Sequence, residues 1–323
     1  MFQAVSEFFK TTAFFNSALF GISALVLQGV LGCLPGLVMG DAPKKRVDAG
    51  LVQIFAALVA SILSIVIIVC TSAYPVGSWK IIALTCASSY YTGMSNFIML
   101  LLMSKAMQSG PNGIIWATIQ SAFVFPFIVS VAFFGVVLTP WRLAGVVFLL
   151  AALGFFAATK DNQDRSGKWK MLAFTCLAMC AVQQNITSLP SFFPESRGVP
   201  SIVRALFEAG AIVITGVICN LIKMTPARLE MIKENLRNPV LWKYVAIIQN
   251  FHVIIAYVLF YPGLNAMAAS GLGGMSFPLI TGSCIVSFSI AGIVFLKERL
   301  TPLQAAGLFC CISGLVLICS GAV

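Results

Sequence analysis

Long apolar stretches follow one another along the whole chain, and this succession constrains the fold more than any other feature. A helix needs about 20 apolar residues to cross the bilayer, and 59% of this chain is hydrophobic whereas only 9% is charged. A soluble domain carries about 25% charged residues. The sequence therefore predicts an all-α membrane protein with ten transmembrane helices, over residues 13–39, 50–70, 81–104, 113–135, 140–159, 170–189, 200–221, 242–261, 270–295 and 301–322.

Basic residues give the chain a formal net charge of +10, which on its own would suit a nucleic-acid-binding protein. Their positions argue against this, because most of them lie in short links between apolar stretches. Such charges set the topology of membrane proteins and concentrate in cytoplasmic loops. Fifteen lie in links that follow odd-numbered spans, and four lie on the opposite side. The sequence thus predicts no nucleic-acid partner and places both termini outside the cytoplasm.

A short echo divides the chain into two halves. Leu-Thr-Pro-Trp-Arg-Leu-Ala-Gly at 138–145 recurs as Leu-Thr-Pro-Leu-Gln-Ala-Ala-Gly at 300–307, with five of the eight residues identical. We predict a first five-helix repeat over 1–160 and a second over 161–323. Because five is odd, the halves would enter the membrane in opposite directions, an inverted repeat typical of secondary transporters.

Proline and glycine mark helix ends and packing positions. Pro140 and Pro302 fall where spans are predicted to begin, a position that tolerates proline because its missing amide hydrogen would be unpaired anyway. The one long polar link, 222–240, is predicted to form an amphipathic helix on the membrane. Two roles are open for the Gly-rich segment 271–274. The simpler one is close packing, and the other is a flexible start of the ninth span. Four further glycines fit close packing of helices in lipid, namely Gly145, Gly154, Gly307 and Gly314.

The stretch 295–307, Phe-Leu-Lys-Glu-Arg-Leu-Thr-Pro-Leu-Gln-Ala-Ala-Gly, leads into the last span. Together with ten spans and a five-plus-five repeat, it resembles the drug/metabolite transporter superfamily, and its EamA-type members in particular. In that family a short Glu-containing link precedes the last span, here with Glu298. Val-Pro-Ser-Ile-Val-Arg-Ala-Leu-Phe at 199–207 resembles the family's Arg-containing start of a repeat's second span. The resemblance implies a ten-span transporter. Many members hold both termini in the cytoplasm, whereas the loop charges here indicate the reverse.

Charged side chains inside apolar spans are candidates for a functional site, because a central charge costs about 2.5–3.5 kcal/mol on insertion scales. Glu208 is the only acidic residue well inside a predicted span, and Arg204 lies four residues earlier, on the same helix face. The two charges could simply neutralise each other near the start of the helix. Alternatively, Arg204 faces an anionic or zwitterionic substrate, or Glu208 carries a coupling proton.

Uncharged polar residues extend this set. His252 is the sole histidine, and a packing role competes with a role in binding, since histidine titrates near neutral pH. The repeat aligns His252 with Tyr90 and Gln28 with Gln183, which would bring these positions to the axis between the halves. Hydrogen bonding between helices is the alternative role. The predicted substrate-binding residues, lining a cavity near the bilayer midplane with Glu208 as coupling residue, are Gln28, Tyr90, Asn96, Gln120, Gln183, Asn185, Arg204, Asn250 and His252.

These features favour a secondary transporter that moves a small polar metabolite, sugar-like or amino-acid-like, by alternating access with ion or proton coupling or by exchange. A multidrug or metabolite efflux transporter is the alternative, and an intramembrane enzyme using His252 is a more distant one. One histidine and one buried acid do not suffice for a metal site, and no Walker motif is present. The sequence predicts no enzyme activity, no metal and no cofactor. The expected partners are a small-molecule substrate and membrane lipid, a homodimer stays open, and the expected location is the plasma (inner) membrane.

Overall fold

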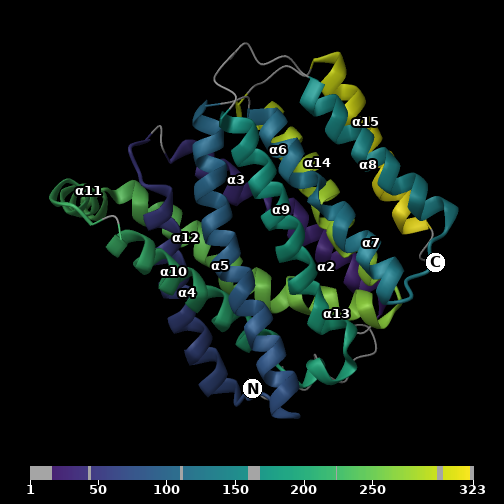
Figure 1. Ribbon diagram of the computed structural model, residues 1–323, viewed down its shortest axis with the longest axis horizontal. Helices are drawn as coiled ribbons and strands as arrows, with labels where there is room; N and C mark the ends of the chain where they lie inside the picture. Colours follow the sequence, from purple (N-terminus) through teal and green to yellow (C-terminus); the bar gives the residue numbers. More distant parts are fainter. Residues whose placement is uncertain are drawn as a thin grey trace. The chain divides into compact units, whose positions relative to one another are not determined.

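The computed structural model describes residues 17–42, 45–109, 112–158, 168–222, 224–296 and 301–320, and no β-strand occurs among them. Figure 1 shows these residues wound into helices along the chain. Seven helices in this part of the chain are long and apolar enough to cross a membrane. The chain is therefore an all-α, multi-pass membrane protein.

Most elements are α-helices, joined by short 3-10 segments and one π-helix. The α-helices are α2 (Ala18–Leu31), α3 (Cys33–Asp41), α4 (Ala49–Thr71), α5 (Trp79–Ser109), α6 (Asn112–Gln120), α7 (Val124–Phe133), α8 (Pro140–Ala158), α9 (Lys168–Ser188), α10 (Ser201–Ile222), α11 (Pro226–Arg237), α12 (Pro239–Asn250), α13 (Tyr261–Ala269), α14 (Ser276–Leu296) and α15 (Pro302–Ser320). The 3-10 segments are η3 (Ser121–Phe123), η4 (Leu189–Phe192), η5 (Pro194–Gly198) and η7 (Gly273–Met275), and the π-helix is η6 (Phe251–Phe260).

Each of the ten predicted spans overlaps a helical segment of the structure. The predicted starts of α8 at Pro140 and of α15 at Pro302 are confirmed. Three spans fall short of the crossing criteria in the described residues. α5 is 31 residues long but carries serines, tyrosines, threonine and asparagine in its middle, and Thr118–Phe133 and Pro140–Phe155 are shorter apolar helices. Ten crossings therefore stay a prediction.

The outer face of α4 is apolar and exposed. On α4, Ile62, Ile65, Val66 and Val69 are each between 51% and 62% exposed. A water-soluble protein rarely leaves such a continuous apolar face uncovered. An exposed apolar face of this kind suits contact with lipid, while the opposite side of α4 packs into the protein.

Contacts divide the described residues into two compact units. The first comprises Leu34–Leu101 with Phe193–Tyr261, and the second comprises 17–33, 102–192 and 262–320. Each unit combines helices from both halves of the sequence. Long-range packing between the halves, and not only local hairpins, thus builds each unit.

In the first unit, α4 packs along α10 in the opposite direction. Ile54 in α4 lies against Gly216 near the end of α10, where an added Cβ would sit 2.7 Å from Ile54 Cδ1. Asp48, which caps the start of α4, is joined through Arg228 to Asn220 near the end of α10. Arg228 Nη1 donates to Asp48 Oδ2 over 2.8 Å and Nη2 donates to Asn220 Oδ1 over 2.6 Å. The start of one helix thus meets the end of the other.

α11 confirms the helix predicted in the link 222–240. Asn235 on its inner side is buried, and its Oδ1 accepts a hydrogen bond from the Asp48 backbone N–H over 2.8 Å. Its outer side carries Lys233 and Glu230, an exposed ion pair at 2.8 Å. The helix is therefore amphipathic, and its placement on a membrane surface stays a prediction.

In the second unit, α8 and α15 lie side by side, as Figure 1 shows. A Cβ on Gly145 would lie 2.8 Å from the Gly314 carbonyl oxygen and 2.6 Å from Ile318 Cγ1. Further along α8, Leu149 Cγ lies 3.1 Å from where a Cβ on Gly314 would be. Residues later in α8 thus contact residues earlier in α15, so the two helices are antiparallel. The predicted close packing at Gly145 and Gly314 is confirmed.

Other glycine predictions fare differently. Within the described residues, no atom lies within 4 Å of a Cβ added to Gly154. Its predicted packing role is therefore wrong for this part of the chain, because Gly154 lies on the exposed side of α8. Gly307 is buried in α15. Gly273 is in the 3-10 segment η7 and packs on Phe192, whose ring would lie 2.6 Å from an added Cβ. The packing explanation therefore holds for η7. The link with Glu298 lies outside the described residues.

Candidate functional site

A buried cation lies inside α10. Arg204 is 0% exposed and is the bulkiest fully buried side chain in the described part of the chain. Glu208 is half-buried one turn later, and the two charges interact electrostatically. At about 1.5 Å of rise per residue, Glu208 lies about 10 Å from the start of α10. Glu208 is thus well away from the start of an apolar helix.

Tyr261 joins these two charges from the start of α13. It is 0% exposed. Its hydroxyl donates a hydrogen bond to Glu208 Oε2 over 2.7 Å, and Arg204 Cζ lies 4.0 Å from the centroid of its ring. A cation over an aromatic face is attracted by the ring, by about 2 kcal/mol or more when water is excluded. We call Arg204, Glu208 and Tyr261 the charge cluster.

α5 covers one side of the charge cluster. An added Cβ on Gly93 would collide with the Glu208 carbonyl oxygen and lie 3.1 Å from the Cβ of Ala211. The absence of a side chain at Gly93 therefore lets the backbones of α5 and α10 approach closely. Cys86, about two turns earlier on α5, is buried and close enough to interact with Arg204. α5 therefore lies beside the charge cluster.

His252 lies in η6, where the backbone is wound as a π-helix, a form frequent at functional sites. It is 9% exposed, and its Nε2 is buried without a hydrogen-bond partner among the described residues. The Oε1 atom of Gln249, one turn earlier, is likewise buried and unpartnered in this part of the chain. A buried polar atom without a partner costs about 1–3 kcal/mol. The sequence predicted the span but not its π-helical winding.

The other predicted residues of the first unit lie on α5 and α12. Tyr90 and Asn96 are half-buried on α5. Asn250 is exposed, and its Nδ2 donates to the Ala246 carbonyl of its own helix over 2.8 Å. The Asn250 amide therefore supports α12, and its oxygen stays available to another donor.

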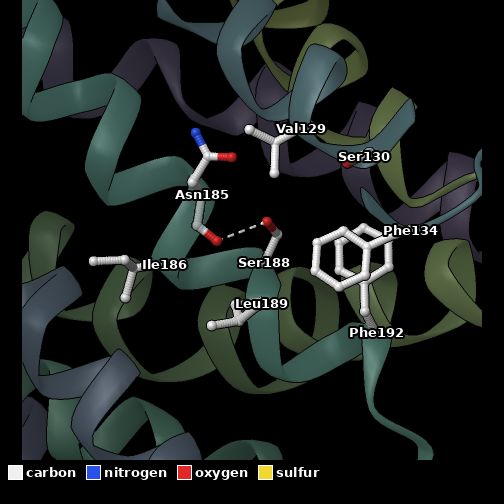
Figure 2. A pocket seen from close by; sticks show the side chains of 8 residues that line it. All are labelled: Val129, Ser130, Phe134, Asn185, Ile186, Ser188, Leu189 and Phe192. Atoms are coloured by element: carbon white, nitrogen blue, oxygen red, sulfur yellow. Dashed lines mark hydrogen bonds between the residues drawn. The ribbon is translucent and has the colours of Figure 1, made fainter. Parts of the chain in front are cut away.

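Four predicted residues lie in the second unit. Gln28 in α2 has a buried Oε1 with no hydrogen-bond partner in the described residues. Gln120, at the end of α6, and Gln183, in α9, are half-buried. Asn185 Nδ2 donates to the Ala181 carbonyl over 2.8 Å, and Asn185 lines a cavity near the end of α9, which Figure 2 shows.

The structure brings Arg204 and Glu208 together, as their spacing predicts. It places six of the ten predicted residues in the first unit and four in the second, and a common cavity for all ten stays a prediction. Tyr261 was missed, because a tyrosine at the end of a predicted span carries no signal that it reaches a residue 53 positions away. In the described ranges, no group of three or more His, Cys, Asp or Glu side chains could hold a metal ion.

Comparisons with known proteins show a likeness of fold. No protein family matches the chain, and no curated protein matches it. A protein of known crystal structure is similar to it with a TM-score of 0.65 and 15% sequence identity, over 93% of this chain and 98% of that chain. At this identity the likeness shows the fold alone.

Proposed function

We propose that this chain is a secondary transporter that moves a small polar solute across the plasma (inner) membrane by alternating access. The charge cluster carries the proposal. Ionisable side chains within apolar helices are costly, and they mark substrate pathways and proton relays. Here the phenol of Tyr261 in α13 contacts both the guanidinium of Arg204 and the carboxylate of Glu208 in α10. Apolar residues would pack a purely structural contact at lower cost.

The packing directions of the helices support an inverted repeat. The antiparallel pair α4 and α10 corresponds to the second and seventh predicted spans, and the pair α8 and α15 to the fifth and tenth. A two-fold axis in the membrane plane pairs equivalent helices in opposite directions. We therefore propose ten crossings in two inverted halves, in the manner of the drug/metabolite transporter superfamily.

The contacts of the cluster suggest how it would work. When Glu208 is ionised, it offsets the charge of Arg204 and accepts the Tyr261 hydrogen bond. When Glu208 takes up a proton, Arg204 loses its anionic neighbour and can receive the carboxylate of an anionic or zwitterionic solute. Proton uptake and solute binding would thus be coupled through one guanidinium. The further hydrogen-bonding groups assigned to a polar substrate are Gln28, Tyr90, Asn96, Gln120, Gln183, Asn185, Asn250 and His252.

The test is transport by the purified protein in liposomes. Uptake and efflux of labelled sugars, amino acids and nucleosides are measured with and without a proton gradient, and we expect one solute class to accumulate. Glu208→Gln keeps an oxygen acceptor for Tyr261 but cannot titrate. It should abolish gradient-driven accumulation and leave solute exchange intact. Glu230→Gln, which removes an exposed carboxylate paired with Lys233, is the matched control and should transport like the wild type.

Two outcomes would contradict the proposed roles. If Glu208→Gln lowers stability but leaves accumulation unchanged, the carboxylate only neutralises Arg204. If both Glu208→Gln and Gln183→Ala transport and unfold like the wild type, these polar groups are not the site.

A further inference from the structure

A cavity of about 120 Å³ opens in the second unit where α7 and α9 end. The last turns of α7 contribute Val129 and Ser130, and α9 contributes Asn185 and Ser188. Figure 2 shows these side chains around the cavity, with two phenylalanine rings on one side. The cavity is close in size to one of about 150 Å³ that binds benzene in another protein. It is therefore large enough for a single six-membered ring.

The aromatic side of the cavity is flat and held in place. The rings of Phe134 and Phe192 are stacked, with centroids 4.0 Å apart and planes 13° from parallel, as Figure 2 shows. Behind Phe192 lies Gly273, where an added Cβ would sit 2.6 Å from the ring. Phe192 is thus fixed between Phe134 and η7. A flat, rigid aromatic wall favours a planar ligand, because ring pairs prefer stacked or edge-to-face contacts.

The polar atoms at the cavity are acceptors more than donors. The Ser188 hydroxyl donates to the Asn185 carbonyl over 3.0 Å, and the Ser130 hydroxyl donates to the Pro126 carbonyl over 2.6 Å. Asn185 uses one amide hydrogen on its own helix, as described above. Among the described residues no hydrogen-bond donor reaches the two hydroxyl oxygens or the Asn185 Oδ1 atom, so these acceptors are available to a ligand. A ligand with an O–H or N–H donor would match them.

The lining also selects against charge. None of the side chains that line the cavity is ionisable, and an unpaired charge placed there would lose its hydration without compensation. A lipid acyl chain would fit poorly, because it is longer than the cavity and offers no donor. A neutral, planar molecule satisfies the size, the flat wall and the acceptors together.

We propose that this cavity is a binding site for a single neutral aromatic ring that carries a hydroxyl or amino group, a ligand of the phenol or aniline class. The idea that a transported solute binds here on its way across the membrane rests on the proposed function, whereas the binding itself does not. Phe134, backed by Phe192, would stack on the ring, and Asn185 and Ser188 would accept its hydrogen bond.

Binding is tested by ¹⁹F NMR with the full chain in lipid nanodiscs and with empty nanodiscs as the blank. The probes are 4-fluorophenol, which is planar with a donor, and 4-fluoroanisole, which is planar without one. We expect saturable binding of 4-fluorophenol, and binding of 4-fluoroanisole weaker by about threefold to tenfold, as the loss of one hydrogen bond implies. Asn185→Leu should remove this preference, whereas Thr175→Val, at an exposed position of the same helix, should keep it.

A filling variant tests the location. Val129→Phe should occupy the cavity and abolish saturable binding, whereas Val147→Phe, at a position 53% exposed on α8, should not. Equal binding by the wild type and Val129→Phe would overturn the proposal, and so would an equal preference in Asn185→Leu. Co-purification of a lipid chain that blocks 4-fluorophenol would overturn it as well. Saturable binding together with a failure to transport any solute would refute the proposed function and leave the site standing.

Discussion

The hydrogen bond between Tyr261 and Glu208 holds the charge cluster together. Tyr261→Phe removes the hydroxyl and keeps the ring, so the stacking of Arg204 at 4.0 Å from the ring centroid is retained. Glu208→Ala removes the acceptor. A double-mutant cycle of these two changes isolates the hydrogen bond, because the cost of depriving Arg204 of its anionic neighbour occurs in both forms that lack Glu208 and cancels.

The expected coupling energy follows from the setting of the two groups. A hydrogen bond to a charged group contributes about 1.5–3 kcal/mol in soluble proteins, whereas cycles inside membrane proteins average about 0.6 and reach about 1.7 kcal/mol. Tyr261 is 0% exposed and donates at 2.7 Å, which favours the upper part of the membrane range. Glu208 is half-buried, which limits the gain. We therefore expect a coupling of about 1–1.5 kcal/mol.

The assay is reversible unfolding in mixed micelles, followed by tryptophan fluorescence, for the wild type, both single variants and the double variant. Tyr257→Phe is the control, because Tyr257 is half-buried in the neighbouring η6 and its hydroxyl makes no hydrogen bond to the described residues. That change should shift the free energy of unfolding by less than about 0.5 kcal/mol. A coupling energy below about 0.3 kcal/mol would refute the reasoning, since the two side chains would then not act as a unit.

Three further predictions concern packing, a polar link and orientation. Gly145→Ala should lower the free energy of unfolding by about 1–3 kcal/mol, because its methyl group would collide with the backbone of α15. Gly154→Ala, the same change at an open position of the same helix, should be neutral or stabilising by up to about 1 kcal/mol. Equal effects of the two changes would contradict the packing of α8 on α15. Arg228→Gln should lower the free energy of unfolding by about 1–2 kcal/mol, after allowance for the 24% exposure of its side chain, and should speed proteolysis at α11. Arg237→Gln, at an exposed position of the same helix, should do neither. Unchanged cleavage of Arg228→Gln would show that its link to Asp48 does not hold α11. A reporter active only in the cytoplasm and fused after Val323 should give no signal, as the fifteen-to-four bias of loop charges implies, and a strong signal would reverse the orientation.

Local features of the sequence were enough for the helices and many of their ends. Hydropathy places an element over a range because every residue of a crossing helix meets the same apolar surroundings. Pro140 and Pro302 start helices because proline acts on its own backbone and on the preceding turn. The spacing of Arg204 and Glu208 is equally local, since four residues span one turn and put both side chains on one face.

Only the tertiary structure decided which side of each helix is covered and what meets there. Gly145 and Gly154 look alike in the sequence, yet one touches α15 and the other faces open space, because a helix turns by about 100° per residue and a neighbour covers one side of it. Tyr261 reaches Glu208 across 53 residues because η6, which Tyr261 directly follows, packs beside α10, a pairing that depends on the shapes of whole helix faces. The sequence by itself determined where helices run and which polar residues they carry, whereas the chemistry of the candidate site, a cation stacked on a phenol that is bonded to a carboxylate, came from packing between residues that no local pattern connects.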